Sequence, residues 1–285
     1  MQRHHIAPSL GAALAAVMVV QIVPAQAQAQ AQETAADARR HVEYLASDAL
    51  EGRATGSPGA AKAAEYLVAQ LQTLGAHPLP GQADFRIPFE FTAEVSDAGS
   101  RLAGVRRNWA EAGSIQALAF SEDGSTAGDV VFAGYGIVPP ESAEYPYDSY
   151  ATLDVDGKIV LVLDGYPQNT DDEGRRQLSN FDDVRFKAFL ARSRGAKAIL
   201  IARGPLTPGD GAAAAPRAGQ AAGAGIMAAS ISRDVAVTIF KAAGKDLEAV
   251  QAELDTGNPH VTGFDLGIGL TLEIKLTRHR RAGYN

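Results

Sequence analysis

The sequence predicts a mixed α/β protein, and three observations carry that prediction. Two amphipathic helices are expected within residues 34–75. Between residues 159 and 202, two short apolar runs flank a helical pattern, which predicts a βαβ unit. Apolar residues then alternate strictly from Leu266 to Leu276, which is typical of a half-buried strand. With 46% hydrophobic and 21% charged residues, the 285-residue chain has the composition of a folded globular protein.

The two helices are delimited by residues suited to helix ends. The first presents Ala38, Val42 and Leu45 at i, i+4 and i+7, and a glycine-rich loop, LEGRATGSPG, follows it. Ser57 is the expected N-cap of the second helix, because its hydroxyl can accept a free backbone N–H, and Gly75 suits the position after its end. The second helix has a continuous apolar face: Ala61, Ala64, Leu67, Val68, Leu71 and Leu74. Another element must cover each of these faces.

Residues 76–127 form a connecting segment with weaker patterns. Phe85, Ile87, Phe89 and Phe91 alternate with other residues, as in a strand, and Pro88 places that strand at a sheet edge. The pattern of residues 101–114 predicts neither a helix nor a strand.

Strands and helices are clearer from Gly128 onward. VVFAGYG reads as a short strand, and the runs 159–163 and 198–202 read as strands buried on both faces. A helix is expected over residues 182–194, with these apolar positions: Val184, Phe186, Phe189 and Leu190. Residues 204–225 are expected to be a mobile surface loop of low complexity. A strand (GIMAAS) and two helices, capped by Ser232 and Asp246, precede the alternating strand.

The first residues resemble an export signal. Arg3 is followed by an almost uncharged run, Ile6 to Val23, and by alanines two apart that offer A-x-A cleavage sites. We therefore expect residues 1–31 to be a signal peptide, cleaved at about residues 25–31, and the protein to be exported to the periplasm or the medium. The alternative, an uncleaved membrane anchor, needs about 20 apolar residues, and Pro8, Gly11 and Gln21 interrupt this run.

Charge and cysteine content exclude several classes of partner and site. A net charge of −7 without a basic stripe is unsuited to nucleic acid. The absence of cysteine from the sequence excludes disulfides, thiolate zinc sites and a cysteine nucleophile. We expect neither a nucleic acid partner nor a membrane partner after signal cleavage.

No recognisable catalytic or metal-binding constellation is present in the sequence. The histidines outside the signal stand apart, at His41, His77, His260 and His279, whereas a zinc site needs three or four converging ligands. The acidic runs 171–173 and 182–183, and the pair 154/156, lack calcium-loop spacing and are expected to be solvated loop charges. Gly134-Tyr135-Gly136 is expected to be a strand-ending turn. We therefore predict no catalytic residue, no cofactor-binding residue and no metal ligand.

Four stretches together resemble one family. HVEYLASDALEGRATGSPGAAKAAEYLVAQLQTLG resembles the N-terminal helical segment of the secreted di-zinc aminopeptidases, metallopeptidase family twenty-eight. DVVFAGYGI, YPYDSYATLDVDGKIVLVLDGYP and FKAFLARSRGAKAILI resemble the protease-associated (PA) domain inserted in many members. The resemblance implies an α+β PA-type domain with a small mixed sheet or barrel and flanking helices. It also implies that the N-terminal helical pair belongs to an α/β/α aminopeptidase domain.

The same resemblance implies which domains of the family this chain contains and which it lacks. The family's two zinc ions, their ligands and the catalytic Glu lie in a catalytic domain that follows the PA domain, and Asn285 matches only the start of its first strand. We carry no site residue over and expect this chain to be inactive alone. The expected organisation is a helical segment at 34–75, a connecting segment at 76–127, a PA-like domain at 128–280 and the start of the catalytic domain at 281–285.

The leading hypothesis is therefore the non-catalytic front part of an exported zinc aminopeptidase. The whole protein would hydrolyse N-terminal peptide bonds, with the peptide substrate held through the catalytic domain and the PA domain shaping its access. A free-standing PA-type module that binds a peptide or a protein is the alternative, and a periplasmic solute-binding protein is a weaker one. The orphaned helical faces further predict self-association.

Overall fold

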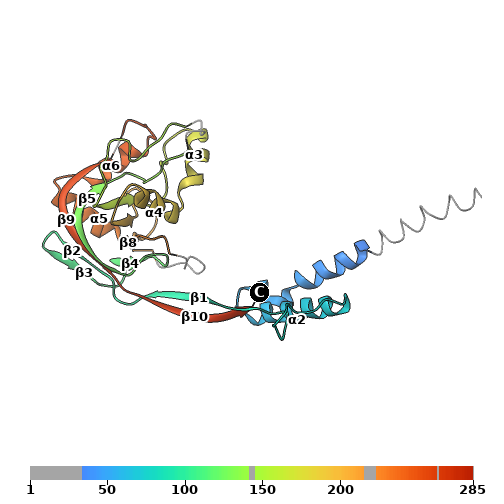
Figure 1. Ribbon diagram of the computed structural model, residues 1–285. Coiled ribbons are helices and arrows are strands. Elements are labelled where there is room, and N and C mark those ends of the chain that lie inside the picture. Colours follow the sequence, from blue (N-terminus) through green and yellow to red (C-terminus); the bar gives the residue numbers. More distant parts are fainter. Residues whose placement is uncertain (1–33, 141–144, 215–222, 262, 285) are drawn as a thin grey trace, which may run out of the picture. The chain divides into compact units, whose positions relative to one another are not determined.

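The computed structural model describes residues 34–140, 145–214, 223–261 and 263–284 (Figure 1). The predicted signal peptide lies outside these residues. The chain divides into two compact units, which are described separately. Unit 1 comprises residues up to Glu90 together with the last residues from Ala282, and unit 2 comprises Phe91–Arg281. No helix in the described ranges is both long enough and apolar enough to cross a bilayer.

Unit 1 contains the two predicted helices. Residues 34–45 are helical, a 3-10 helix, η1, spans Asp48–Arg53, and α2 spans Pro58–Thr73. As predicted, the Ser57 hydroxyl caps α2, accepting a hydrogen bond from the Ala60 N–H at 3.1 Å, and Gly75 has a positive φ of 74° after the helix end. The glycine-rich segment, predicted to be a loop, contains part of the 3-10 helix η1. Leu50 is buried, and its carbonyl oxygen would lie 1.8 Å from a Cβ on Gly59, so glycine is required where η1 meets α2.

Unit 2 is organised around an eight-stranded mixed sheet with the order β3-β2-β9-β5-β6-β7-β8-β4. Its strands are the following: β2 (Arg101–Gly104), β3 (Arg107–Trp109), β4 (Ile115–Ala117), β5 (Gly124–Phe132), β6 (Ile159–Leu163), β7 (Ala198–Ala202), β8 (Met227–Ile231) and β9 (Phe264–Ile274). The four strands β5-β6-β7-β8 are parallel, and β2, β3, β4 and β9 join by antiparallel pairs. The predicted βαβ unit and both of its strands are confirmed.

Helices cover both faces of this sheet. Alternate residues of β6 enter different clusters: Ile159, Leu161 and Leu163 one, Val160 and Val162 the other. The first cluster includes side chains from α5 (Arg233–Ala242) and α6 (Leu247–Leu254), and the second includes side chains from α4 (Val184–Ser193). A short helix, α3 (Asp172–Leu178), and a 3-10 turn, η2 (Ser179–Phe181), precede α4. The central strands are therefore buried on both faces, as their unbroken apolar runs predicted.

Two strand predictions need correction. The strand expected over Phe85–Phe91 begins at Pro88 instead, as β1 (Pro88–Asp97), because a proline that cannot donate a hydrogen bond is tolerated at the first position of a strand. The alternating strand is β9, but it ends at Ile274. Leu276 opens a separate strand, β10 (Leu276–Tyr284), which pairs with β1 in a two-stranded sheet.

The pattern of residues 101–114 predicted no element, and residues 101–109 of this stretch form a hairpin. Strands β2 and β3 pair antiparallel with Gly104 opposite Arg107. Val105 and Arg106 connect them with φ of 50° and 57°, the left-handed conformation that a two-residue turn of this kind needs. A β-branched residue rarely adopts it, so the sequence lacks the usual Asn-Gly or Gly-Gly marker of such a turn.

Candidate functional site

The histidines and acidic runs do not converge on a metal site. His41 bonds through Nδ1 to the Tyr66 hydroxyl at 2.6 Å. Across the described ranges, no group of three or more His, Cys, Asp or Glu side chains could hold a metal ion. The donors present in the described residues therefore do not fit the two zinc ions that the family resemblance implies.

Several carboxylates predicted to be free loop charges have structural partners. Asp171 caps α3 by accepting from the Gly174 N–H at 2.7 Å. Asp183 caps α4 by accepting from the backbone N–H groups of Arg185 and Phe186 at 2.9 and 3.0 Å. These groups are helix caps rather than ligands.

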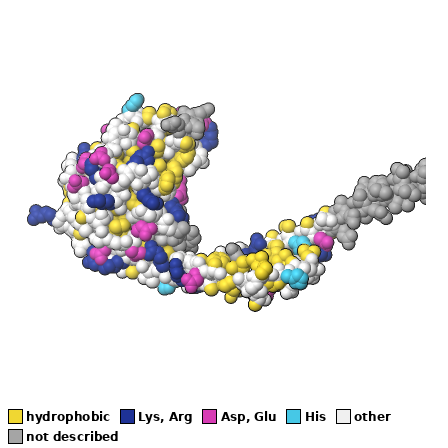
Figure 2. All heavy atoms as spheres, in the orientation of Figure 1, with side chains coloured by type: hydrophobic (Ala, Val, Ile, Leu, Met, Phe, Trp, Pro, Cys, Tyr) yellow, Lys and Arg dark blue, Asp and Glu magenta, His cyan; other side chains and the backbone are white. Residues whose placement is uncertain are grey.

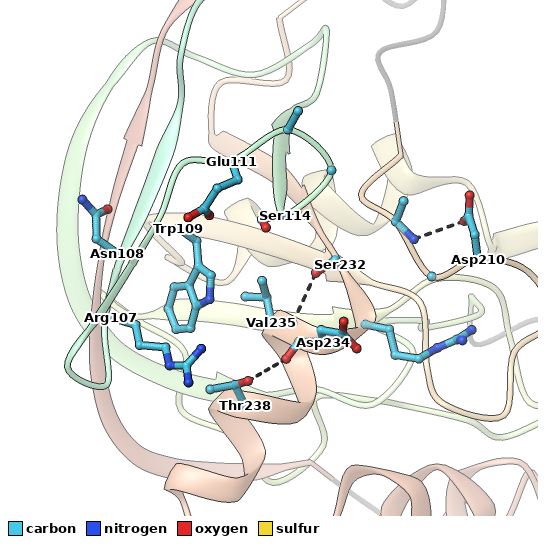
Figure 3. Close-up of a pocket in the computed structure, with 15 residues that line it drawn as sticks. Arg107, Asn108, Trp109, Glu111, Ser114, Asp210, Ser232, Asp234, Val235 and Thr238 are labelled. Carbon is cyan, nitrogen blue, oxygen red and sulfur yellow. Dashed lines mark hydrogen bonds between the residues drawn. The ribbon is translucent and has the colours of Figure 1, made fainter.

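One cavity is lined by residues of β3 at one end of the sheet and by residues that precede β4 at the other end. It has a volume of about 680 Å³ and lies between strand β3 and the N-terminal half of α5 (Figure 3). We call it the seam groove. Its lining comes from β3, the β3–β4 connection, the loop before β8 and helix α5: Arg107, Asn108, Trp109, Glu111, Ala112, Gly113, Ser114, Asp210, Gly211, Ala212, Ser232, Arg233, Asp234, Val235 and Thr238.

Hydrogen bonds to backbone carbonyls connect the segments that line the groove. The Ser232 N–H donates to the Ser114 carbonyl at 2.9 Å, which joins the segment before β4 to the start of α5. Arg233 donates through its guanidinium to the carbonyls of Gly204, Thr207 and Gly209, at 3.1, 2.6 and 3.4 Å. The described start of the low-complexity segment is therefore anchored to α5.

The charges that face the groove are mostly negative. Glu111, Asp210 and Asp234 are exposed carboxylates, and Arg107 is an exposed guanidinium. The guanidinium of Arg233 is engaged by three backbone carbonyls. The ring of Trp109 is nearly buried at the base of the β3 wall. This lining suits a polar ligand that carries a positive group.

A second cavity, of about 350 Å³, lies at the carboxyl ends of β6 and β7. Asp164 and Gly165 follow β6, Arg203 follows β7, and Asp182 precedes α4. Burial raises the pKa of the Asp182 carboxyl. Open parallel sheets commonly bind ligands at this end. Here hydrogen bonds from buried side chains connect the loops that follow the strands to the helices.

Four hydrogen bonds of the buried side chains Lys187, Gln251 and Asp255 connect these loops to the helices. The Lys187 ammonium, 0% exposed, donates to the carbonyls of Leu163 at 3.0 Å and Gly165 at 2.6 Å. The buried Asp255, which follows the last residue of α6, accepts from the Tyr135 hydroxyl at 2.5 Å, and Gln251 of α6 accepts from the Leu206 N–H at 2.9 Å. Burial, followed by the hydrogen bond to Asp255, raises the pKa of Tyr135. These groups stabilise the loops after β5, β6 and β7.

The predicted apolar face of α4 is wrong at one position. Phe189 was expected on the apolar face but is 55% exposed, whereas Lys187 is fully buried. Lys187 lies three and four residues before the buried Leu190 and Ala191, so it shares their face of the helix. The seam groove itself was missed, because its walls are more than 100 residues apart in the sequence and neither wall contains a motif.

No family model and no curated protein matches the chain. Among solved structures, it is similar to an aminopeptidase from Aneurinibacillus sp. strain AM-1, with 19% identity and a TM-score of 0.41 over 86% of this chain. It is also similar to a peptidase M28 precursor from Shewanella amazonensis SB2B (17%, TM-score 0.36, 87% of this chain). A third similar structure is a zinc aminopeptidase from Bacillus subtilis, with 17% identity and a TM-score of 0.35 over 85% of this chain. The chain spans about half the length of these structures, 45%, 51% and 45%. These scores are too low to transfer a function.

Proposed function

We propose that this chain is the non-catalytic front part of an exported zinc-dependent aminopeptidase. Unit 1 would pack against a catalytic sheet supplied by further sequence, and unit 2 would act as the PA domain that shapes access of the peptide. Hydrolysis of the N-terminal peptide bond would belong to that further sequence, because the described residues of this chain do not fit a zinc pair.

The observation that carries this proposal is the uncovered apolar face of unit 1. Val42 is 65% exposed, Leu67 48% and Leu74 81%, and Tyr44 and Leu71 are exposed as well. Figure 2 shows hydrophobic side chains gathered over the part of the chain that Figure 1 labels α2. Amphipathic helices in folded proteins bury such a face, and a contiguous exposed apolar patch marks an interaction surface. Within the described residues, the helical segment whose sequence resembles the aminopeptidases is therefore the one with an exposed apolar face.

Hydrogen exchange on the full 285-residue protein tests the packing part of the proposal. In a monomer at low concentration, amides of α2 should exchange at least about 1,000-fold faster than those of β6 and β7, because α2 opens locally. The strands of unit 2 are the internal control. Protection of α2 equal to that of β6 in a monomer would contradict the proposal.

Two further measurements test the enzymatic part. After dialysis the protein should hold no stoichiometric zinc and should not cleave an aminoacyl-nitroanilide, and turnover with bound zinc would contradict the proposal. Reading the coding DNA past codon 285 should show a continuing frame with a His-x-Asp element.

A free-standing binding module is the second candidate, and the completeness of unit 2 favours it. Unit 2 has a sheet covered on both faces and a groove of its own. A monodisperse monomer encoded by a frame that stops after codon 285 would support this candidate over the first.

A further inference from the structure

We propose that the seam groove binds an extended peptide segment, which adds as a strand to the free edge of β3 and presents a positively charged group to Glu111 and Asp234. This deepens the proposed function by naming where unit 2 would hold a peptide. Peptide binding in the groove does not depend on the proposed function. Only the identification of that peptide as the substrate of an aminopeptidase rests on it.

The first argument is the free edge. Strand β3 is the last strand of the eight-stranded sheet, and within the described residues it pairs with β2 alone. An edge strand presents backbone N–H and C=O groups on its outer side, where an added chain can pair. All three residues of this edge strand, Arg107, Asn108 and Trp109, line the groove of about 680 Å³.

The second argument is the opposite wall. Helix α5 faces β3 across the groove with Asp234, Val235 and Thr238 (Figure 3). A groove between an edge strand and a helix is a recurring site for extended peptides: the strand provides main-chain hydrogen bonds and the helix selects side chains. The volume falls within the range of about 300–1,000 Å³ that ligand sites occupy.

The third argument is the charge, which selects the ligand class. A helix N-terminus usually favours an anion, but here the Ser232 hydroxyl accepts from the Val235 N–H at 3.3 Å and Asp234 lies in the first turn. The partial positive charge at the N-terminus of α5 is therefore already compensated by the Asp234 carboxylate. The groove also has two guanidinium groups, of which Arg233 is bound by backbone carbonyls and Arg107 is exposed. The three carboxylates of Glu111, Asp210 and Asp234 outnumber them, so an ammonium or guanidinium is favoured over a phosphate. The ligand that this groove favours is a peptide with a central lysine or arginine.

Trp109 provides a direct readout, because it is the single tryptophan of the chain and lines the groove. The probe is a tryptophan-free nonapeptide of alternating Thr and Val with one central Lys, and its matched partner has Glu at the centre. Titration into the full chain should shift the Trp109 emission, with the Lys peptide binding about tenfold more tightly than the Glu peptide.

Matched variants separate groove binding from general charge effects. Asp234→Lys should reverse the preference toward the Glu peptide, whereas Glu248→Lys, an exposed first-turn carboxylate on α6 outside the groove, should leave it unchanged. Thr238→Phe should fill the groove and weaken both peptides at least about tenfold. Preserved Trp109 emission without peptide verifies that each variant folds.

Three results would overturn the inference: no response of Trp109 to either peptide, an unchanged preference in Asp234→Lys, or undiminished binding by Thr238→Phe. The assay needs neither zinc nor catalysis. A failure here therefore leaves the hydrogen-exchange test of unit 1 intact, and failure of that test leaves peptide binding by unit 2 intact.

Discussion

Helices α2 and α5 have similar amphipathic sequences but opposite surroundings. On α5, Val235, Ala236, Ile239 and Phe240 are buried against the sheet of unit 2. On α2 only Gly59 and Ala63 are buried, and its leucines face outward. The comparison shows that an apolar stripe determines a helix's need for a partner, and that burial follows only where the chain supplies one.

The largest expected difference between the units comes from truncating one leucine in each. Leu161→Ala in β6 removes a fully buried side chain and should lower the free energy of unfolding by about 3 kcal/mol, within a range of roughly 2–5 kcal/mol. Leu67→Ala in α2 should change it by less than about 0.5 kcal/mol, because that side chain is already half exposed. Urea unfolding followed by Trp109 fluorescence measures the loss in unit 2, and circular dichroism at 222 nm, which also reports the helices of unit 1, measures the effect of Leu67→Ala.

If Leu161→Ala does not fold, Leu161→Val offers a milder truncation at the same position. Equal losses for Leu161→Ala and Leu67→Ala would mean that unit 1 has a core of its own.

A second, intermediate effect concerns the buried cation of unit 2. Burial lowers the pKa of Lys187 from 10.5 to about 8. Between these values the unfolded chain binds more protons than the folded protein, so the free energy of unfolding should rise with pH, by up to about 1.4 kcal/mol per unit. Urea midpoints at pH 7, 8, 9 and 9.5 measure this rise.

Lys187→Met should abolish that rise, and Lys241→Met, at an exposed position of α5, should retain it. The range stops below pH 10 because tyrosines titrate above it. Burial raises the pKa of Tyr147 to about 12, so its ionisation opposes folding at high pH. A rise that persists in Lys187→Met would assign the effect to another group.

The smallest expected difference compares two helix caps. Asp183→Ala removes the cap of α4 and should lower the free energy of unfolding by about 1 kcal/mol. Ser57→Ala removes the equivalent cap of α2, and it should speed amide exchange in α2 while leaving the urea midpoint of unit 2 unchanged. A shift of that midpoint by Ser57→Ala would show that the two units unfold together.

Much of unit 2 could be predicted because its elements are specified locally. Ile159–Leu163 and Ala198–Ala202 are continuous apolar runs, and a run of that length buried on both faces is a parallel strand. The hairpin of β2 and β3 could not be predicted, since its strands have four and three residues and its turn uses Val105 and Arg106. The groove that depends on this hairpin was missed for the same reason.

The helix starts at Ser57, Ser232 and Asp246 and the periods of the strands follow from the sequence alone, because caps and hydrophobic periods act between near neighbours. The burial of Lys187, the exposure of Phe189 and the groove lined by β3 and α5 arise only when the chain folds. Those outcomes depend on which distant residues meet. Carbonyls at the end of β6 hold the lysine, and the order of the strands leaves β3 at an edge.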